Sequence, residues 1–179
     1  MGQCLKLCCQ QRVIRIHLFG GRKVGKFTLT NKWRTGRILD KSKYTINFFD
    51  YDEFLYQNCQ FQVWTYPLVQ QIFFSVYWQK NDAIILLLDS SQLEQTNLVQ
   101  NYLHENILQI NEMKSPKKIT ILILANKSDI CQHNVQEILE CVNAKRLTDR
   151  INYKLMYTNC FSGEGLNEAL QWLISNTQY

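Results

Sequence analysis

The 179-residue sequence contains no apolar run that approaches the length of a membrane-spanning helix. Its first residues also lack the apolar core of a secretory signal peptide. The seven cysteines are odd in number and are not spaced like a disulfide framework, which favours reduced thiols. These absences argue against a helical membrane protein and against a disulfide-stabilised secreted domain, and we expect a cytoplasmic protein.

Concentrated charge is absent as well. The chain has 20 Lys and Arg residues against 15 Asp and Glu residues, and the resulting net charge of +5 is spread thinly. A protein that binds nucleic acid usually shows a concentrated basic run, so no nucleic-acid partner is expected, although an anionic membrane surface would be favoured modestly. The length and the 46% apolar content fit one domain with a sizeable core, without internal repeats or low-complexity segments.

What the sequence does contain is a phosphate-loop motif, G-x-x-x-x-G-K, directly behind a short apolar segment. Arg12–Phe19 reads as a strand that leads into this loop. The glycines allow backbone N–H groups to turn toward phosphate oxygens, and Lys26 is expected to reach the outer phosphates. The motif consists of Gly20, Gly21, Arg22, Lys23, Val24, Gly25 and Lys26.

A second motif, Asn126–Asp129, follows the apolar segment Ile119–Ala125. The Asp129 carboxylate can accept two hydrogen bonds from the N1 and N2 edge of guanine, which adenine cannot donate. Asn126 is expected at N7 of the base, and the stem of Lys127 is expected to cover the ring. Because both motifs follow apparent strands in the right order, the sequence predicts a site for GTP or GDP.

Apolar strands alternate with amphipathic helical patterns along the chain, which is typical of a mostly parallel sheet covered on both faces. The fold class expected is therefore α/β of the P-loop NTPase type, with six strands and helices on both faces. Residues 1–11 are expected to form an N-terminal tail and residues 12–179 the domain. Strands are expected at Arg12–Phe19, Ala83–Asp89 and Ile119–Ala125, and as a hairpin within Tyr44–Trp64 that turns at Tyr56–Asn58. Helices are expected at Gly25–Thr35, Gln92–Asn111, Val135–Val142 and Leu166–Asn176.

With both motifs in place, the chain resembles the ADP-ribosylation factor (Arf) and Arf-like branch of the small GTPases over essentially its whole length. The absence of a C-terminal prenylation box after Tyr179 argues against the Ras, Rho and Rab branches. The local features that carry the resemblance are Gly2, Thr45, Ile46, Phe48, the segment Phe61–Trp64 and the loop Cys160–Leu166.

The resemblance has several implications for sites and partners. Cys160 and Phe161 would belong to the last loop that contacts guanine, and Thr45 would be a Mg²⁺ ligand in the first switch segment. An aromatic surface between the switch segments would receive effector or regulatory proteins, and the protein would act at membranes in vesicle trafficking. Most aromatic residues in and after the switch segments are expected in the core, and the others would contribute to that surface. They are Phe48, Phe49, Phe61, Trp64, Phe73, Phe74, Tyr77 and Trp78.

Acylation is a further implication of the N-terminal residues. Gly2 could carry myristate, although Lys6 stands where the myristoylation pattern prefers Ser or Thr. Palmitate could be attached to Cys4, Cys8 or Cys9. One acyl chain binds a bilayer marginally, so a second chain or nearby basic residues would be needed to hold the protein on a membrane. The alternative is an unmodified tail with reactive thiols.

The chain departs from the family pattern at the metal site. Phe27 stands where a Ser or Thr hydroxyl normally ligates Mg²⁺, and a phenyl ring offers no oxygen to a hard cation. Thr28 does not simply replace it, because one residue along a helix rotates the side chain by roughly 100°. Phe27 and Thr28 are still expected to line the nucleotide, but Mg²⁺ binding is in doubt.

The second departure lies in the second switch segment, where Thr65–Val69 replaces Asp-x-Gly-Gly-Gln. Thr65 replaces the carboxylate that orients the water of the metal. Leu68 replaces the Gly whose N–H contacts the γ-phosphate, and Val69 replaces the Gln that positions the attacking water. Intrinsic hydrolysis is therefore expected to be very slow or absent, and no catalytic residue is assigned.

Two residue-level alternatives stay open. Arg22 and Lys23 could neutralise phosphate charge in place of a metal, or they could simply face solvent. Asp89, at the end of an apolar strand, could orient a metal as in other P-loop NTPases, which would indicate an ATPase of another class. The motif Asn126–Asp129 argues against that second reading.

Three functions remain possible on this sequence. The first is a switch that binds GTP and GDP and recruits effectors, with hydrolysis supplied by a partner protein. The second is a degenerate GTPase that holds nucleotide constitutively, or holds none, and acts as a scaffold. The third is a hydrolytic enzyme, either an ordinary GTPase or an NTPase that uses Asp89.

Overall fold

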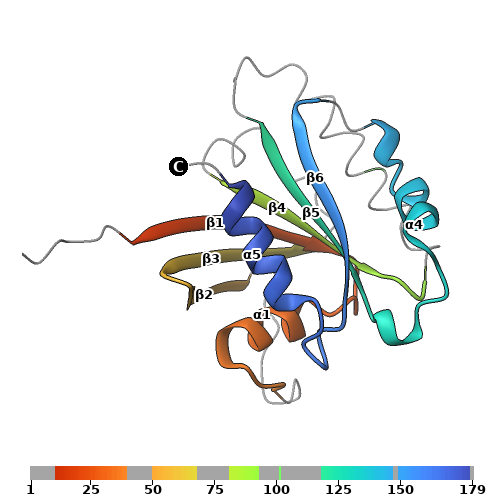
Figure 1. The fold of residues 1–179 in the computed structure, drawn as a ribbon. Coiled ribbons are helices and arrows are strands. Elements are labelled where there is room, and N and C mark those ends of the chain that lie inside the picture. Colours follow the sequence, from red (N-terminus) through yellow and green to blue (C-terminus); the bar gives the residue numbers. More distant parts are fainter. Residues whose placement is uncertain are drawn as a thin grey trace, which may run out of the picture.

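The computed structural model describes residues 11–39, 50–67, 81–92, 101, 118–146 and 149–177. Six strands form one sheet in the order β2-β3-β1-β4-β5-β6 (Figure 1). The strands are β1 (Arg12–Gly20), β2 (Asp50–Tyr56), β3 (Cys59–Pro67), β4 (Ala83–Asp89), β5 (Ile119–Asn126) and β6 (Ile151–Thr158). The helices described are α1 (Lys26–Thr35), α4 (Val135–Cys141) and α5 (Leu166–Asn176), with short 3-10 turns at Ser128–Ile130 and Ala144–Arg146.

All strand pairs except one are parallel, which confirms the expected α/β class. The exception is the antiparallel hairpin of β2 and β3. Its two turn residues, Gln57 and Asn58, have φ angles of 46° and 61°. Positive φ at both central positions matches the right-handed twist of the flanking strands, so the turn sets the register in which Tyr56 faces Cys59.

Helices cover both faces of the sheet, as expected from the sequence. On one face, α1 and α5 pack against β1 and β3 through side chains such as Leu29, Phe61 and Leu170. On the other face, Ile138 of α4 packs against the β4 and β5 side chains. Figure 1 shows α5 lying across the sheet, with α4 beyond its β6 edge. Every residue of β4 and β5 is buried, which explains their unbroken apolar sequences.

The strand β6 was not identified from periodicity, although a six-stranded sheet was expected. Its residues are buried only at the ends, at Ile151 and Thr158, because β6 lies at the edge of the sheet and, among the described strands, pairs with β5 alone. An edge strand of mixed polarity gives neither the continuous apolar run nor the strict alternation that identified the other strands.

Several expectations fall on residues that the structure does not describe. They concern the acylation sites Gly2 and Cys4, the metal ligand Thr45, the switch residues Leu68 and Val69, and nearly all of the helix expected at Gln92–Asn111. Among the described residues, no helix is both long and apolar enough to cross a membrane.

Candidate nucleotide-binding site

The phosphate loop connects the end of β1 to the start of α1 and passes close to β4. A Cβ atom on Gly20 would lie 2.7 Å from the Leu87 carbonyl oxygen and 2.8 Å from a methyl carbon of Val24. Gly20 is therefore required by close packing against the neighbouring strand. Gly25, with φ of 108°, ends the loop in a conformation that favours glycine.

Lys26 is placed at the first position of α1, with its ammonium group over the loop. Its Nζ atom donates to the carbonyl oxygens of Gly20 and Gly21 at 2.6 and 2.7 Å. The first turn of α1 has no acidic residue and no side-chain cap. Backbone N–H groups at a helix start and a nearby cation together attract phosphate oxygens, so this arrangement suits the predicted ligand.

Arg22 and Lys23, in the middle of the loop, are both exposed. Lys23 has φ of 61°, a left-handed backbone that a side chain adopts at some cost. Their exposure favours the alternative in which both cations face solvent. A role in neutralising phosphate charge stays a prediction.

Asn126 joins three segments that surround the expected position of the base. Its Nδ2 atom donates to the carbonyl of Val24 at 2.7 Å, and its Oδ1 atom accepts from the backbone N–H of Cys160 at 2.9 Å. A Cβ atom on Gly25 would lie 2.5 Å from Asn126 Nδ2, so close packing as well as the positive φ excludes a larger residue at this position. The two predicted motifs and the loop after β6 therefore meet at the carboxyl ends of the parallel strands.

Lys127 pairs with Asp89 at the end of β4. The two side chains form an ion pair, and the Asp89 carboxylate is almost fully buried. Burial alone would raise the pKa of Asp89, but the hydrogen bonds from Lys127 and Ser91 hold the pKa below its ordinary value. Because this carboxylate is committed to Lys127, the geometry speaks against the metal-orienting role that was left open for Asp89.

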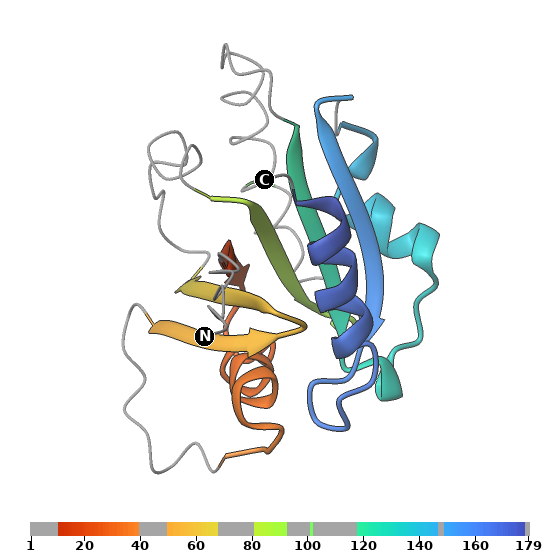
Figure 2. The same cartoon turned by 60° about the vertical axis from the view of Figure 1, so that its left-hand side comes forward.

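Asp129 lies in the turn Ser128–Ile130 beside the loop that follows β6, as Figure 2 shows for the two segments. Its Oδ1 atom accepts from Nδ2 of Asn159 at 2.9 Å. Cys160 is buried, which raises the pKa of its thiol to about 12 and keeps it protonated. The side chain of Phe161 is 72% exposed and would be available to an aromatic ring of a ligand.

The side-chain contacts that two residues make at this site were not predicted from the sequence. Asn159 was given no function, and Asp89 was considered only for a metal. Neither role could have been found from spacing within a motif, because each contact joins two strand ends that are separated by about 30 or more residues in the chain.

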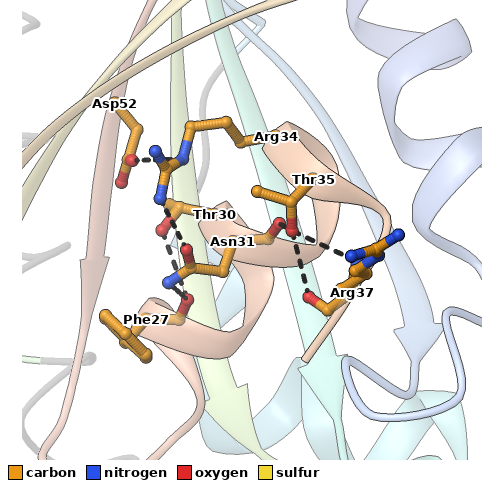
Figure 3. Close-up of polar contacts among 7 residues, drawn as sticks. All are labelled: Phe27, Thr30, Asn31, Arg34, Thr35, Arg37 and Asp52. Carbon is orange, nitrogen blue, oxygen red and sulfur yellow. Dashed lines mark hydrogen bonds and ion pairs between the residues drawn. The ribbon is translucent and has the colours of Figure 1, made fainter. Parts of the chain in front are cut away.

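The described donors on the phosphate side do not fit Mg²⁺. Phe27 brings a ring, and its carbonyl oxygen already accepts from Asn31 Nδ2 at 2.9 Å and from Thr30 Oγ1 at 3.4 Å (Figure 3). The hydroxyl of Thr65 is buried and has no hydrogen-bond partner among the described residues. A neutral hydroxyl there does not reproduce the carboxylate that a hard divalent cation prefers.

Asn31 connects the same turn of α1 to the hairpin. Its Oδ1 atom accepts from Arg34 at 2.8 Å, and the Arg34 guanidinium lies 3.3 Å from Asp52 of β2 (Figure 3). The buried amide is thereby satisfied at both ends, as a polar group inside a core must be. This network fixes the backbone next to Phe27 in place.

The aromatic surface expected near the switch segments is described only in part. Trp64 is half-buried, and its ring lies 5.3 Å from that of Tyr51 and 5.8 Å from that of His17. Phe61 is fully buried in the core, which agrees with the core position expected for most of these aromatics, and it is stacked on Phe54 at 5.2 Å. The other aromatic residues expected there lie outside the described part, namely Phe48, Phe49, Phe73, Phe74, Tyr77 and Trp78.

Comparisons with known proteins agree with this geometry. Two similar relatives are the ADP-ribosylation factor-like protein 1 of Drosophila melanogaster and that of Caenorhabditis elegans. The fly protein is 29% identical over 170 residues, which cover 93% of this chain and 89% of the relative. The worm protein is 28% identical over 170 residues, which cover 93% and 91%.

Among solved structures, the fold is similar to that of the Arl6 BBS3 small GTPase from Trypanosoma brucei, which was solved with the nucleotide analogue GppNp. The TM-score is 0.70 at 21% identity, over 91% of this chain and 96% of the other, so this likeness supports the fold. The model of the ADP-ribosylation factor family matches residues 1–177. The chain is therefore a member of the ADP-ribosylation factor family of small GTPases.

Proposed function

We propose that this Arf-family protein binds guanine nucleotides and hydrolyses GTP very slowly or not at all. The base side of the site supports binding, since Asn126, Lys127 and Asp129 are all present and each is held by contacts to other segments. The family binds GTP and GDP. The observation that carries the second half of the proposal is Phe27, in the first turn of α1 beside Lys26.

Hydrolysis requires that a metal ion and an attacking water be positioned on the γ-phosphate. Phe27 offers no side-chain oxygen to the metal, and Thr65 offers no charge. Val69, in place of the catalytic Gln, cannot orient a water molecule. Leu68 also replaces the Gly whose N–H contacts the γ-phosphate. With four contributions missing, restoring one of them leaves the others absent, and the barrier stays high.

The test is single-turnover hydrolysis of radiolabelled GTP by the purified protein. The wild-type protein and the single variant Leu68→Gly should both release phosphate no faster than the buffer control. A hydrolysis rate clearly above that control in either protein would refute the proposal. Tight binding of fluorescent GDP, lost in Asp129→Asn, is the accompanying positive control for a folded site.

We also propose that the protein recruits partner proteins, at an intracellular membrane in vesicle trafficking, through the surface around Tyr51 and Trp64. The partial exposure of these aromatic side chains supports a contact surface. Flotation with anionic vesicles, comparing the wild-type protein expressed in eukaryotic cells with Gly2→Ala, tests the membrane part. Equal flotation of both proteins would contradict a role for an acylated Gly2.

A further inference from the structure

We propose that Asp89 and Asn159, which lie outside the base-reading motif, are positioning residues that hold Lys127 and Asp129 in place for guanine. The proposal rests on the proposed guanine-nucleotide binding and names what sets the affinity and the base preference of that site. It starts from two side-chain contacts that cross from one strand end to the next, Asp89 with Lys127 and Asn159 with Asp129.

The orientation of the Asn159 amide follows from its surroundings. Its Oδ1 atom accepts from two backbone N–H groups, those of Phe161 at 2.9 Å and Ser162 at 3.1 Å. Because the oxygen must face these donors, the NH₂ group must face Asp129, where it donates to Oδ1 at 2.9 Å. The loop therefore determines which end of the amide meets the carboxylate.

This contact matters because Asp129 is an exposed side chain. A carboxylate on the surface samples several rotamers, and the ligand would have to immobilise it on binding. Within the described part of the chain, the hydrogen bond from Asn159 engages Oδ1 alone, which leaves the second oxygen and the remaining lone pairs of Asp129 available. Asn159 thereby presents an aligned acceptor to the N1 and N2 edge of guanine before the nucleotide arrives.

Asp89 is oriented in a similar way toward Lys127. Its Oδ1 atom accepts from the backbone N–H and the hydroxyl of Ser91, at 3.1 and 2.6 Å. The other oxygen, Oδ2, is paired with the Lys127 ammonium. Lys127 itself has a left-handed backbone, with φ of 65°, so both ends of its stem are fixed. A stem fixed in this way can cover the face of any purine.

The two residues should therefore have separable effects. Loss of the Asp89 contact frees the Lys127 stem and weakens binding of every purine nucleotide by a similar factor. Loss of the Asn159 contact misaligns Asp129 and weakens guanine more than hypoxanthine, which lacks the 2-amino group. A residue that only stabilised the fold would leave the ratio of the GDP and IDP affinities of the folded protein unchanged.

The test uses the full chain and measures dissociation constants for GDP and IDP by competition with a fluorescent GDP. The variants are Asn159→Asp and Asp89→Asn, which keep side-chain size. Asn159→Asp retains an acceptor for Phe161 and Ser162 but turns a second carboxylate toward Asp129. Matched controls lie at the opposite ends of the same strands, away from the site. They are Asn152→Asp in β6, where the native amide donates to Asn176, and Asp82→Asn before β4, where the native carboxylate pairs with Arg15.

We expect the preference for GDP over IDP to fall about tenfold in Asn159→Asp, because the misaligned Asp129 carboxylate loses its charge-assisted hydrogen bond to the 2-amino group of guanine. Lowering the pH should restore part of this preference, since one of two facing carboxyl groups then carries a proton and can donate it. In Asp89→Asn, both affinities should fall by the same factor of about three to ten. The two control variants should match the wild-type protein.

An unchanged GDP to IDP ratio in Asn159→Asp, or unchanged affinities in Asp89→Asn, would overturn the inference while leaving guanine binding intact. Absence of any guanine preference in the wild-type protein would overturn both the inference and the proposed function. If Asn159→Asp fails to fold, Asn159→Ser replaces it, because a hydroxyl can accept from the local N–H groups whereas the amide that donates to Asp129 is removed.

Discussion

Lys23 has a left-handed backbone conformation that strains a residue with a side chain. Lys23 lies in the phosphate loop with φ of 61°, and its side chain is exposed. Glycine adopts this conformation without strain, so Lys23→Gly should raise the free energy of unfolding by up to about 1 kcal/mol. Urea unfolding measures the change. The neighbouring Arg22→Gly, at a residue without positive φ, should not stabilise the protein, and a loss of stability in Lys23→Gly would contradict the expected relief of strain.

His17 gives a second residue-scale prediction, concerning pH. Burial among aromatic rings lowers its pKa to about 4 from 6.5, a shift only partly offset by its hydrogen bond with Asn81. Below pH 6.5 the unfolded chain therefore binds a proton that the folded protein does not. The contribution of His17 to stability should fall by about 3 kcal/mol as the pH drops from 6.5 toward 4, and this contribution should change little below that range.

Urea unfolding at pH 7.5, 5.5 and 4.5 checks this expectation, with His17→Phe as the comparison. The variant keeps a ring against Tyr66, which stacks on His17 at 5.0 Å, but has no titrating group. Its stability should depend less on pH over this range. Equal slopes in the two proteins would show that His17 does not cause the loss.

The site residues that could be predicted from the sequence are those that belong to motifs with fixed spacing. Lys26, Asn126 and Asp129 were found because their motifs impose fixed spacing on groups that must converge on one ligand. Asn159 was not found, because its partner Asp129 lies on a different loop, and only the parallel arrangement of β5 and β6 brings the two together.

Arg12, at the start of β1, forms hydrogen bonds with the end of α5. Its guanidinium donates to the Ile174 carbonyl at 2.8 Å and to the Thr177 hydroxyl at 2.6 Å. A cation at a helix C-terminus also interacts favourably with the helix dipole. Arg12→Ala should therefore lower the free energy of unfolding by about 1–3 kcal/mol, since several charge-assisted hydrogen bonds are lost.

Thermal unfolding tests this contact, with Arg15→Ala as the control on the same strand. Arg15 is exposed, and its guanidinium is 3.9 Å from Asp82, so its removal should cost less than about 1 kcal/mol. Equal losses in the two variants would mean that the contact between β1 and α5 contributes no more than an ordinary surface ion pair.

Elements were predictable where burial left a clear pattern. The fully buried strands β4 and β5 and the helix α5 have apolar spacing that reveals them directly. The helix α1 begins at Lys26, one residue after the expected start, and ends at Thr35 as expected, because Gly36 has the positive φ typical of a residue that ends a helix. The edge strand β6 was not predicted, because it is stabilised by pairing with β5 and its own sequence has no clear pattern of apolar residues.

At the scale of the whole molecule, the two sides of the nucleotide site differ. On the base side, Asn126, Lys127 and Asp129 are each fixed by contacts among the described residues. On the phosphate side, Phe27 and Thr65 remove the donors that would hold a metal against the γ-phosphate. A ligand changes a conformational equilibrium only through contacts that differ between the two states. We therefore expect GDP and GTP to have similar effects on this protein.

The most direct measurement is calorimetric titration of nucleotide-free protein with GDP and with a non-hydrolysable GTP analogue, in magnesium and in chelator. We expect the two dissociation constants to agree within about threefold, and chelator to change neither by more than that factor, because a ligand without state-dependent contacts shifts no equilibrium. A GTP analogue bound more than about tenfold tighter than GDP, with the difference abolished by chelator, would contradict metal-independent binding and indicate a working switch.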